Sequence, residues 1–243
     1  MPRARMTRSE LKATDEITTT LERFTETAIA RKKQILIVAA AVIAVLGVFF
    51  SWQYYASGRT AAAQTQLARV ISAFHDPSAK SEKERFEKAI VEAQQTMTTY
   101  PSSQAASLAQ YYLALSQDGL GDMANAVKNL EEVIGRGDTD ITPVAQFALA
   151  GVYKRNGELQ KAVDIFKQLD AAGGYTKATV AYELGATAEA AGQKDVAQTA
   201  YSKVITEFPE SMFRREAEAA LKRMGLPIPA PAPVPAPTDV KVP

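Results

Sequence analysis

Cysteine is absent from the 243 residues of the sequence, and histidine occurs once. The lack of cysteine excludes disulfides, thiolate nucleophiles, thiolate-bound zinc and a lipid anchor on cysteine. The single histidine, His75, stands beside a predicted helix break and is a poor candidate for a catalytic base or a metal ligand. We therefore predict no catalytic residue, no cofactor site and no metal site, and we expect that the protein is not an enzyme.

Two short motifs that could carry chemistry are also incomplete. Asp138 and Asp140 flank one residue, but the 12-residue ligand pattern of calcium-binding loops is missing. We expect an ordinary turn with a helix cap there. The pair Gly173-Gly174 lacks the Lys-Ser or Lys-Thr of a phosphate-binding loop, so we expect a turn between repeats.

A strongly basic surface is missing from the larger part of the chain. Of the 28 basic and 27 acidic residues, residues 1–34 hold eight and five, which leaves 20 and 22 for the remainder. The N-terminal piece is thus about +3 and the rest about −2. Because nucleic acid binding needs clustered cations that neutralise phosphates, we expect no nucleic-acid partner.

One long hydrophobic run is present. From Ile35 to Phe50 every residue is apolar except Gly47, and no charge appears before Arg59. Residues 35–55 would form roughly 30 Å of helix, enough to cross a bilayer, with Trp52 and two tyrosines near one end, where aromatic rings favour the headgroup layer. The run predicts a single transmembrane helix over residues 35–55, in contact with membrane lipid.

The flanking charges predict the orientation of this helix. Arg31, Lys32 and Lys33 precede it, whereas few cations follow it closely. The positive-inside rule places residues 1–34 in the cytoplasm and residues 56–243 outside it. Two alternatives are a cleaved signal peptide, with cleavage near Gly58, and a buried core helix. We favour an uncleaved anchor because the preceding polar segment is long for a signal peptide.

The two ends of the chain differ in character. Within the segment 1–34, residues 9–33 carry a thin apolar stripe, which predicts an amphipathic helix on the membrane surface or against a membrane partner. A solvated tail is the alternative. At the other end, seven of the last 17 residues are proline, so the segment 226–243 is expected to be a disordered, polyproline-like linker.

Between these ends the sequence repeats itself. Gly121, Gly157 and Gly192 are spaced by 36 and 35 residues, and small or apolar residues recur at fixed distances from each. The pattern predicts three helix–turn–helix units, about residues 103–138, 139–174 and 175–209, with a capping helix over 210–224 in a domain of residues 56–225. A degenerate unit precedes them, in which residues 59–74 continue the membrane helix and a capping box of Ser81 and Glu84 opens a second helix.

These units resemble the tetratricopeptide repeat. The middle unit matches the family pattern through Leu149-Ala150, Tyr153, Ala162 and Phe166, and the last unit through Leu184-Gly185, Ala197, Tyr201 and Pro209. No unit has the family's early tryptophan. The resemblance implies an all-α fold, with the membrane helix followed by an α-solenoid of about three to four helix–turn–helix units.

In this family the first helix of each unit lines a groove that binds proteins. Carried over position by position, the resemblance implies nine candidate groove residues: Leu108, Tyr111, Leu115, Val144, Phe147, Lys154, Arg155, Tyr182 and Glu189. The three aromatic rings among them would form a ladder, although packing between neighbouring repeats is the favoured alternative for each ring. For Lys154 and Arg155 we expect a solvated helix end.

The layout as a whole resembles the ancillary subunit family of the SecYEG translocon in bacterial inner membranes. That resemblance implies a periplasmic repeat domain and translocon subunits, chaperones or exported clients as partners. The Pro-rich tail departs from it. A scaffold for envelope assembly or cell division and a self-associating structural membrane protein are the alternative functions.

Overall fold

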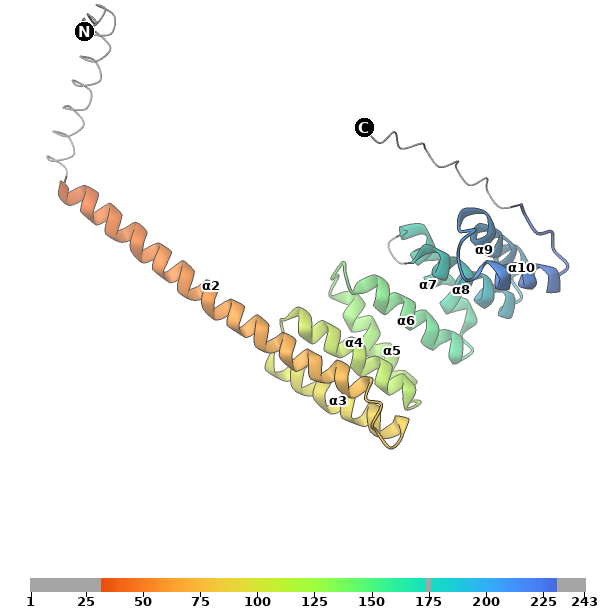
Figure 1. Cartoon of the computed structure of the whole chain (residues 1–243), viewed down its shortest axis with the longest axis horizontal. Helices are drawn as coiled ribbons and strands as arrows, with labels where there is room; N and C mark the ends of the chain where they lie inside the picture. Colours follow the sequence, from red (N-terminus) through yellow and green to blue (C-terminus); the bar gives the residue numbers. More distant parts are fainter. Residues whose placement is uncertain (1–31, 174–175, 231–243) are drawn as a thin grey trace, which may run out of the picture. The chain divides into compact units, whose positions relative to one another are not determined.

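The computed structural model describes residues 32–173 and 176–230, which contain nine α-helices and no strand. By their internal contacts the residues fall into two compact units, Met1–Thr60 and Ala61–Pro243. The all-α solenoid predicted from the sequence is confirmed. The helices in chain order (Figure 1) are α2 (Lys32–Phe74), α3 (Glu82–Thr99), α4 (Gln104–Gly119), α5 (Met123–Gly135), α6 (Thr142–Arg155), α7 (Leu159–Ala172), α8 (Lys177–Ala190), α9 (Lys194–Glu207) and α10 (Arg214–Arg223).

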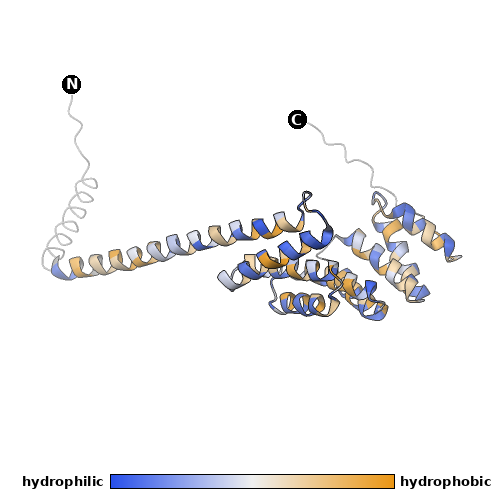
Figure 2. Cartoon of the chain, turned by 90° about the horizontal axis from the view of Figure 1, so that it is seen from below, coloured by the Kyte–Doolittle hydropathy of each residue, from blue (hydrophilic) through white to orange (hydrophobic). Residues whose placement is uncertain are grey.

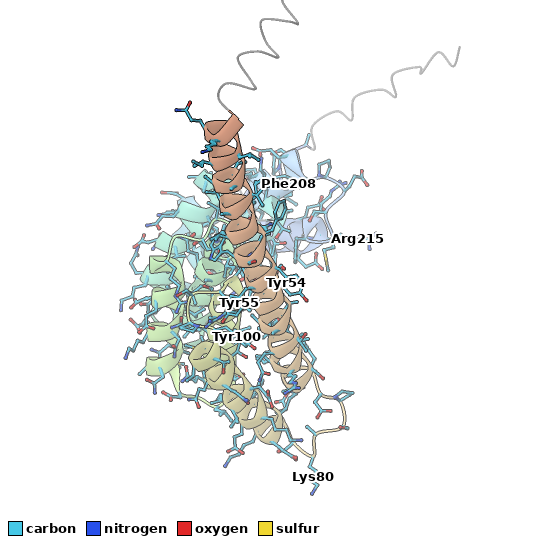
Figure 3. All side chains as sticks on the ribbon, turned by 90° about the vertical axis from the view of Figure 1, so that its left-hand side faces the viewer. Tyr54, Tyr55, Lys80, Tyr100, Phe208 and Arg215 are labelled. Atoms are coloured by element: carbon cyan, nitrogen blue, oxygen red, sulfur yellow. The ribbon has the colours of Figure 1, made fainter. Side chains whose placement is uncertain are left out.

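The first part of α2, in the first unit, is apolar and exposed (Figure 2). Twelve large hydrophobic side chains from Leu36 to Tyr55 keep 47% to 83% of their surface accessible, including Tyr54 and Tyr55, which Figure 3 labels. An exposed apolar surface of this extent marks a site of interaction with lipid or protein. Among the described residues, one helix, Ala40–Phe74 of 35 residues, is long and apolar enough to cross a membrane. This helix is compatible with the predicted anchor.

The last turns of α2 belong to the second unit and act there as a repeat helix. Ala63, Leu67 and Val70 recur every three or four residues and are 1%, 4% and 0% exposed. With Ala93 of α3 and Ala105 of α4, among others, they form a hydrophobic core. The predicted continuation of the helix through residues 59–74 is confirmed, and α2 and α3 form a hairpin ahead of the three best-matched repeats.

Three further hairpins follow, α4–α5, α6–α7 and α8–α9, and each turns at a glycine. Gly121, Gly157 and Gly192 have φ of 81°, 79° and 73°, a left-handed conformation that glycine adopts without steric cost. The residues seven positions before and five positions after each glycine are small and buried: Ala114, Ala150, Gly185, Ala126, Ala162 and Ala197. The two helices of a hairpin can therefore approach closely.

The helix α10, Arg214–Arg223, follows the last hairpin and lies within the segment 210–224 for which the sequence predicts a capping helix. Its buried stripe, Ala217, Ala220 and Leu221, joins the core formed by the hairpins from α4 onward. Gly225, with φ of 70°, ends the helix, and the N–H of Leu226 donates to the carbonyl of Leu221 at 2.9 Å. This pair of features is a helix-ending motif that satisfies a terminal carbonyl.

The capping box predicted at the start of α3 is formed in one direction only. The Ser81 hydroxyl accepts the N–H of Glu84 at 3.1 Å, as expected. The Glu84 carboxylate, however, accepts the N–H of Lys80 at 3.1 Å instead of that of Ser81. Together with the Lys88 ammonium, this bond holds the pKa of the Glu84 carboxyl below its usual range.

The helix cap predicted at Asp138 and Asp140 is wrong, although the turn is confirmed. The Asp138 carboxylate accepts the N–H of Asp140 at 3.0 Å, which forms a local turn. The residue that caps α6 is Ile141, which makes no side-chain cap bond. Since Pro143 in the first turn has no N–H, this helix start has one donor fewer to satisfy.

Some predictions fall on residues outside the described ranges. The amphipathic helix over residues 9–33 lies almost wholly outside them, and so does most of the Pro-rich segment 226–243. Of the Gly173-Gly174 pair, Gly173 ends α7 with φ of 70°.

Candidate protein-binding face

The nine candidate groove residues lie on α4, α6 and α8, the first helices of three successive hairpins. Eight of them are half-buried, and Arg155 is exposed. We call the surface that these nine residues share the first-helix face. Within it the apolar and aromatic members are spread along their helices, from Val144 in the first turn of α6 to Leu115 near the end of α4, whereas Lys154, Arg155 and Glu189 come from the last turns.

The aromatic rings of the first-helix face pack partly against their own hairpins. Phe147 meets Phe166 of α7 edge to face, with ring centroids 5.5 Å apart. Tyr182 lies 6.0 Å from the ring of Tyr201 on α9 and stacks at 4.8 Å on Phe213, which precedes α10. Contacts of this kind add to the burial energy of aromatic side chains. Each of these two rings therefore has one side packed against other aromatic rings of the solenoid.

The third ring, Tyr111, packs against the main hydrophobic core and lies 5.5 Å from the ring of Tyr112, its neighbour in the chain. Tyr112 in turn contacts Phe74 at the end of α2, with centroids 5.2 Å apart. The first-helix face is thus continuous, through these rings, with the packing between α2 and α4. His75, beside Phe74, is exposed.

The charged residues at the ends of the first helices pair between hairpins. Lys154 of α6 donates to the Glu183 carboxylate of α8 at 2.8 Å. Arg155 forms an ion pair with Asp118 of α4. Arg155 is exposed, as expected of a solvated helix end, and Lys154 is half-buried. Both cations are in addition paired, because the solenoid brings carboxylates from both neighbouring hairpins to the end of α6.

Glu189 is engaged in a similar way between α8, α9 and α10. Its carboxylate accepts the hydroxyl of Tyr201 at 2.8 Å and a guanidinium N–H of Arg223 at 3.2 Å. Burial, and then the hydrogen bond to Glu189, raises the pKa of Tyr201 above its usual range. Tyr201 is 1% exposed, so its neutral hydroxyl is part of the core and links the hairpin to the cap.

These pairings define what the first-helix face offers a ligand. The cations Lys154 and Arg155 already have carboxylate partners, so a free carboxylate on a ligand would compete with bonds inside the solenoid. Apart from these two cations and Glu189, the first-helix face consists of apolar and aromatic side chains that are half-buried. It can therefore bind through apolar anchors, which dominate many protein interfaces.

Sequence reasoning missed several of the residues involved. Asp118 occupies the same repeat position as Lys154 and Glu189, three residues before the turn glycine, and this shared register was the available signal. No comparable signal marks the buried amide of Gln110, which donates to Asn129 at 3.1 Å across its hairpin. It stands where the family has its early tryptophan.

No group of three or more histidine, cysteine or acidic side chains in the described ranges could hold a metal ion. The buried apolar side chains on the three first helices serve packing, and Lys154, Arg155 and Glu189 on the first-helix face pair with charged residues of other helices.

Known proteins that are similar to the chain include solved structures and one protein family. The chain is similar to a crystal structure of MamA, at 23% identity over 59% of this chain and 81% of that chain, with a TM-score of 0.48. It is also similar to a crystal structure of nearly identical tetratricopeptide-like repeats from a putative kinesin light chain of Podosopora anserina, at 21% identity over 70% of this chain and 92% of that chain, with a TM-score of 0.43. No curated protein sequence matches the chain. The sequence model of the tetratricopeptide repeat-like domain matches residues 32–224, and the chain therefore belongs to the tetratricopeptide repeat-like domain family.

Proposed function

We propose that the protein is a membrane-anchored, non-enzymatic adaptor that binds other proteins through the first-helix face. Members of its repeat family are typically protein-interaction scaffolds, which supports protein partners as the ligand class. The observation that carries the anchoring part is the continuity of α2. One helix provides both the exposed apolar run from Leu36 to Tyr55 and the buried stripe that packs in the first hairpin. An anchor built in this way raises the effective concentration of the repeats for partners at the same membrane.

The finer proposal is an ancillary subunit of the Sec translocon in a bacterial inner membrane. The N-terminus would be cytoplasmic, and the repeats would be periplasmic and would bind chaperones or exported clients. The charge asymmetry around the apolar run and the order of anchor and repeats support it. In this mechanism the repeats recruit a partner, and no bond is made or broken by the protein itself.

The anchor and its orientation can be tested with single cysteines, because the natural chain has none. We expect Gln168→Cys, on the exposed surface of α7, to react with a membrane-impermeant thiol reagent added to the periplasmic side. Ser9→Cys should react only after the membrane is opened. The reverse labelling pattern would overturn the orientation, and release of the protein by alkaline carbonate would overturn the anchor.

Charge in the apolar run provides a second test of the anchor. Ile43→Lys combined with Val45→Lys should move the protein to the soluble fraction, since each lysine at the centre of a bilayer costs about 2.5–3.5 kcal/mol. Ala61→Lys combined with Gln64→Lys, on exposed positions beyond the run, is the matched control and should leave the protein in the membrane.

Binding by the first-helix face can be tested by photo-crosslinking in cells. A photoreactive amino acid is placed at Leu115 or Val144, and, as controls, at the exposed positions Lys167 and Gln168 of α7. Mass spectrometry of the crosslinked full-length protein then identifies the partners. Translocon subunits or periplasmic chaperones at the first two positions alone would support the finer proposal. Envelope-assembly or division proteins there would replace it with the scaffold function, and equal crosslinking at all four positions would refute binding through this face.

A further inference from the structure

The hairpin α2–α3 has one face that no helix among the described residues covers. On its other face Ala93 of α3 packs against Ala105 and Ala109 of α4, and all three are 0% or 1% exposed. Each later hairpin packs against the element that follows it in the chain, which for the last hairpin is α10. The uncovered face is therefore the one on which a further helix can add to the stack.

The uncovered face is a groove of about 780 Å³ between the last turns of α2 and α3, which we call the α2–α3 groove. The loop that joins these helices carries Lys80, labelled in Figure 3. The residues of α2 that line the groove recur every three or four positions from Thr65 to Asp76, and those of α3 do so from Glu84 to Glu92. Two such stripes present the ridges between which a third helix packs. The α2 stripe rises roughly 17 Å, or about three turns of helix.

The side chains of the groove suit an occupant with an apolar stripe. On α2 the lining includes Ala68, Ser72 and Ala73, whose short side chains let a helix backbone approach closely. On α3 the side chain of Val91 is 62% exposed. Covering this side chain with an apolar partner removes its surface from water, which favours binding.

The groove carries a net negative charge. Four carboxylates and two cations line it, which gives a net charge of −2: Asp76, Glu84, Glu87, Glu92, Arg69 and Lys88. Lys88 serves the end near the loop, where its ammonium lies 3.1 Å from the Glu84 carboxylate and 3.8 Å from that of Asp76. The charge of Glu87 and Glu92 lies further along α3, away from this cluster.

Glu87 and Glu92 are weakly compensated. Glu87 lies 3.8 Å from Lys83, but the two side chains are 57% and 75% exposed, and ion pairs in solvent contribute little. Glu92 accepts the side-chain amide of Gln66 at 3.1 Å, and this donor is neutral. Both carboxylates share the α3 stripe with Val91. A cation placed beside an apolar stripe on an occupant would therefore meet them.

We propose that the α2–α3 groove binds an amphipathic helix of a different protein, with its apolar stripe on Val91 and its lysines or arginines toward Glu87 and Glu92. A second groove of the same kind is excluded as the occupant, because two net acidic surfaces repel one another. The basic helix that this chain itself has, α10, is excluded too, since its apolar stripe is buried in the core of the solenoid. The proposal adds a second binding surface and does not depend on the first-helix face.

The first test uses the purified full-length protein in an uncharged detergent. The probe is a synthetic peptide of about 12 residues, roughly three turns, held helical by a covalent staple because free peptides of this length are marginal helices. It carries leucines at every third or fourth position, lysines beside them and one photoreactive residue. We expect it to bind and to crosslink to α2 or α3. Crosslinking to the first-helix face instead, or equal affinity of a peptide with glutamate in place of lysine, would overturn the proposal.

Variants of the groove then test the charges. Glu87→Gln combined with Glu92→Gln should lower the affinity for the lysine peptide about tenfold, since each exposed charge pair contributes about threefold. This difference should shrink at high salt, which screens exposed charges. Glu207→Gln combined with Glu210→Gln, at exposed positions of the last hairpin and of the segment after it, is the matched control and should leave the affinity unchanged. Equal affinities of the two double variants would refute recognition by the groove carboxylates.

The second test identifies the natural occupant in cells. A photoreactive amino acid replaces Ser72, which is exposed and lines the groove, and mass spectrometry identifies the segment that crosslinks to it. We expect a segment of another protein with cations beside a helical apolar stripe, and a lower yield in the Glu87→Gln, Glu92→Gln background. No crosslink, one to this chain itself, or one to a segment without clustered cations would overturn the proposal. Crosslinks from Leu115 and Val144 test the first-helix face separately, so the two can fail independently.

Discussion

Gly185→Ala tests the close approach of helices inside a hairpin. Gly185 lies inside α8 and faces the ring of Tyr201 on α9. A Cβ built there would come within 2.7 Å of Cδ1 and 2.8 Å of Cε1 of that ring. The ring cannot swing away easily, because Tyr201 is 1% exposed and its hydroxyl donates to Glu189 at 2.8 Å.

The expected magnitude follows from two opposing effects. Overpacking of a core typically costs about 1–3 kcal/mol, whereas alanine in place of glycine inside a helix gains about 0.5–1 kcal/mol. The variant should therefore lose about 1–2 kcal/mol in the free energy of unfolding. For a domain of this size that corresponds to a melting temperature lower by about 2–8 °C.

Gly151→Ala is the matched control, because Gly151 also lies inside a first helix, α6. Its Cβ would meet only the flexible guanidinium of Arg155, at 3.4 Å, so this variant should keep the gain in helix propensity and be as stable as the natural protein or more so. The assay is thermal and urea unfolding of the full-length protein in detergent, followed by circular dichroism. If Gly185→Ala proved as stable as Gly151→Ala, the steric argument for the small residue at this repeat position would be refuted.

Further predictions concern a helix cap and a buried hydroxyl. Ser81→Ala removes the side-chain cap of α3 and should lower the free energy of unfolding by about 0.5–2 kcal/mol. Thr176→Ala, at the start of α8 where no side-chain cap bond exists, should lower it little. Equal losses of the two variants in urea unfolding would contradict this prediction. Because the fold raises the pKa of Tyr201, the unfolded chain releases this proton near pH 10 while the folded chain holds it. The stability contribution is complete below about pH 10 and is lost as the pH rises further. Tyr201→Phe should thus reduce the fall in melting temperature between about pH 10 and pH 12. Tyr153, whose pKa is also raised by burial, should account for part of the fall that remains. If Tyr201→Phe left the dependence of melting temperature on pH unchanged, Tyr201 would not hold its proton in the folded chain.

Much of the fold follows from features that are local in the sequence. A turn that needs positive φ requires glycine wherever it stands, so Gly121, Gly157 and Gly192 marked the hairpins without any knowledge of packing. The small residues at fixed distances from these glycines reflect the constant spacing of two antiparallel helices. The apolar run that follows Lys33 is likewise visible from composition alone.

The candidate site could be predicted only in part from the sequence. Repeat register identified the helices and the positions of the first-helix face, but it could not reveal which side chains those positions meet. Arg155 and Asp118 are 37 residues apart, and Lys154 and Glu183 are 29 apart. Pairs at such distances depend on how successive hairpins are rotated against one another, and no local pattern carries that rotation.

The sequence by itself determined the helical repeat, its turns and an apolar segment able to span a membrane, because backbone conformation and hydrophobic period are properties of neighbouring residues. The tertiary structure alone decided which side chains of the last turns of α2 are buried in the first hairpin, Leu67 and Val70 among them. It also decided that the cations at the end of α6 are paired and that no helix among the described residues covers the second face of the hairpin α2–α3. These features arise where separate helices meet, so they depend on packing geometry that no single stretch of sequence contains.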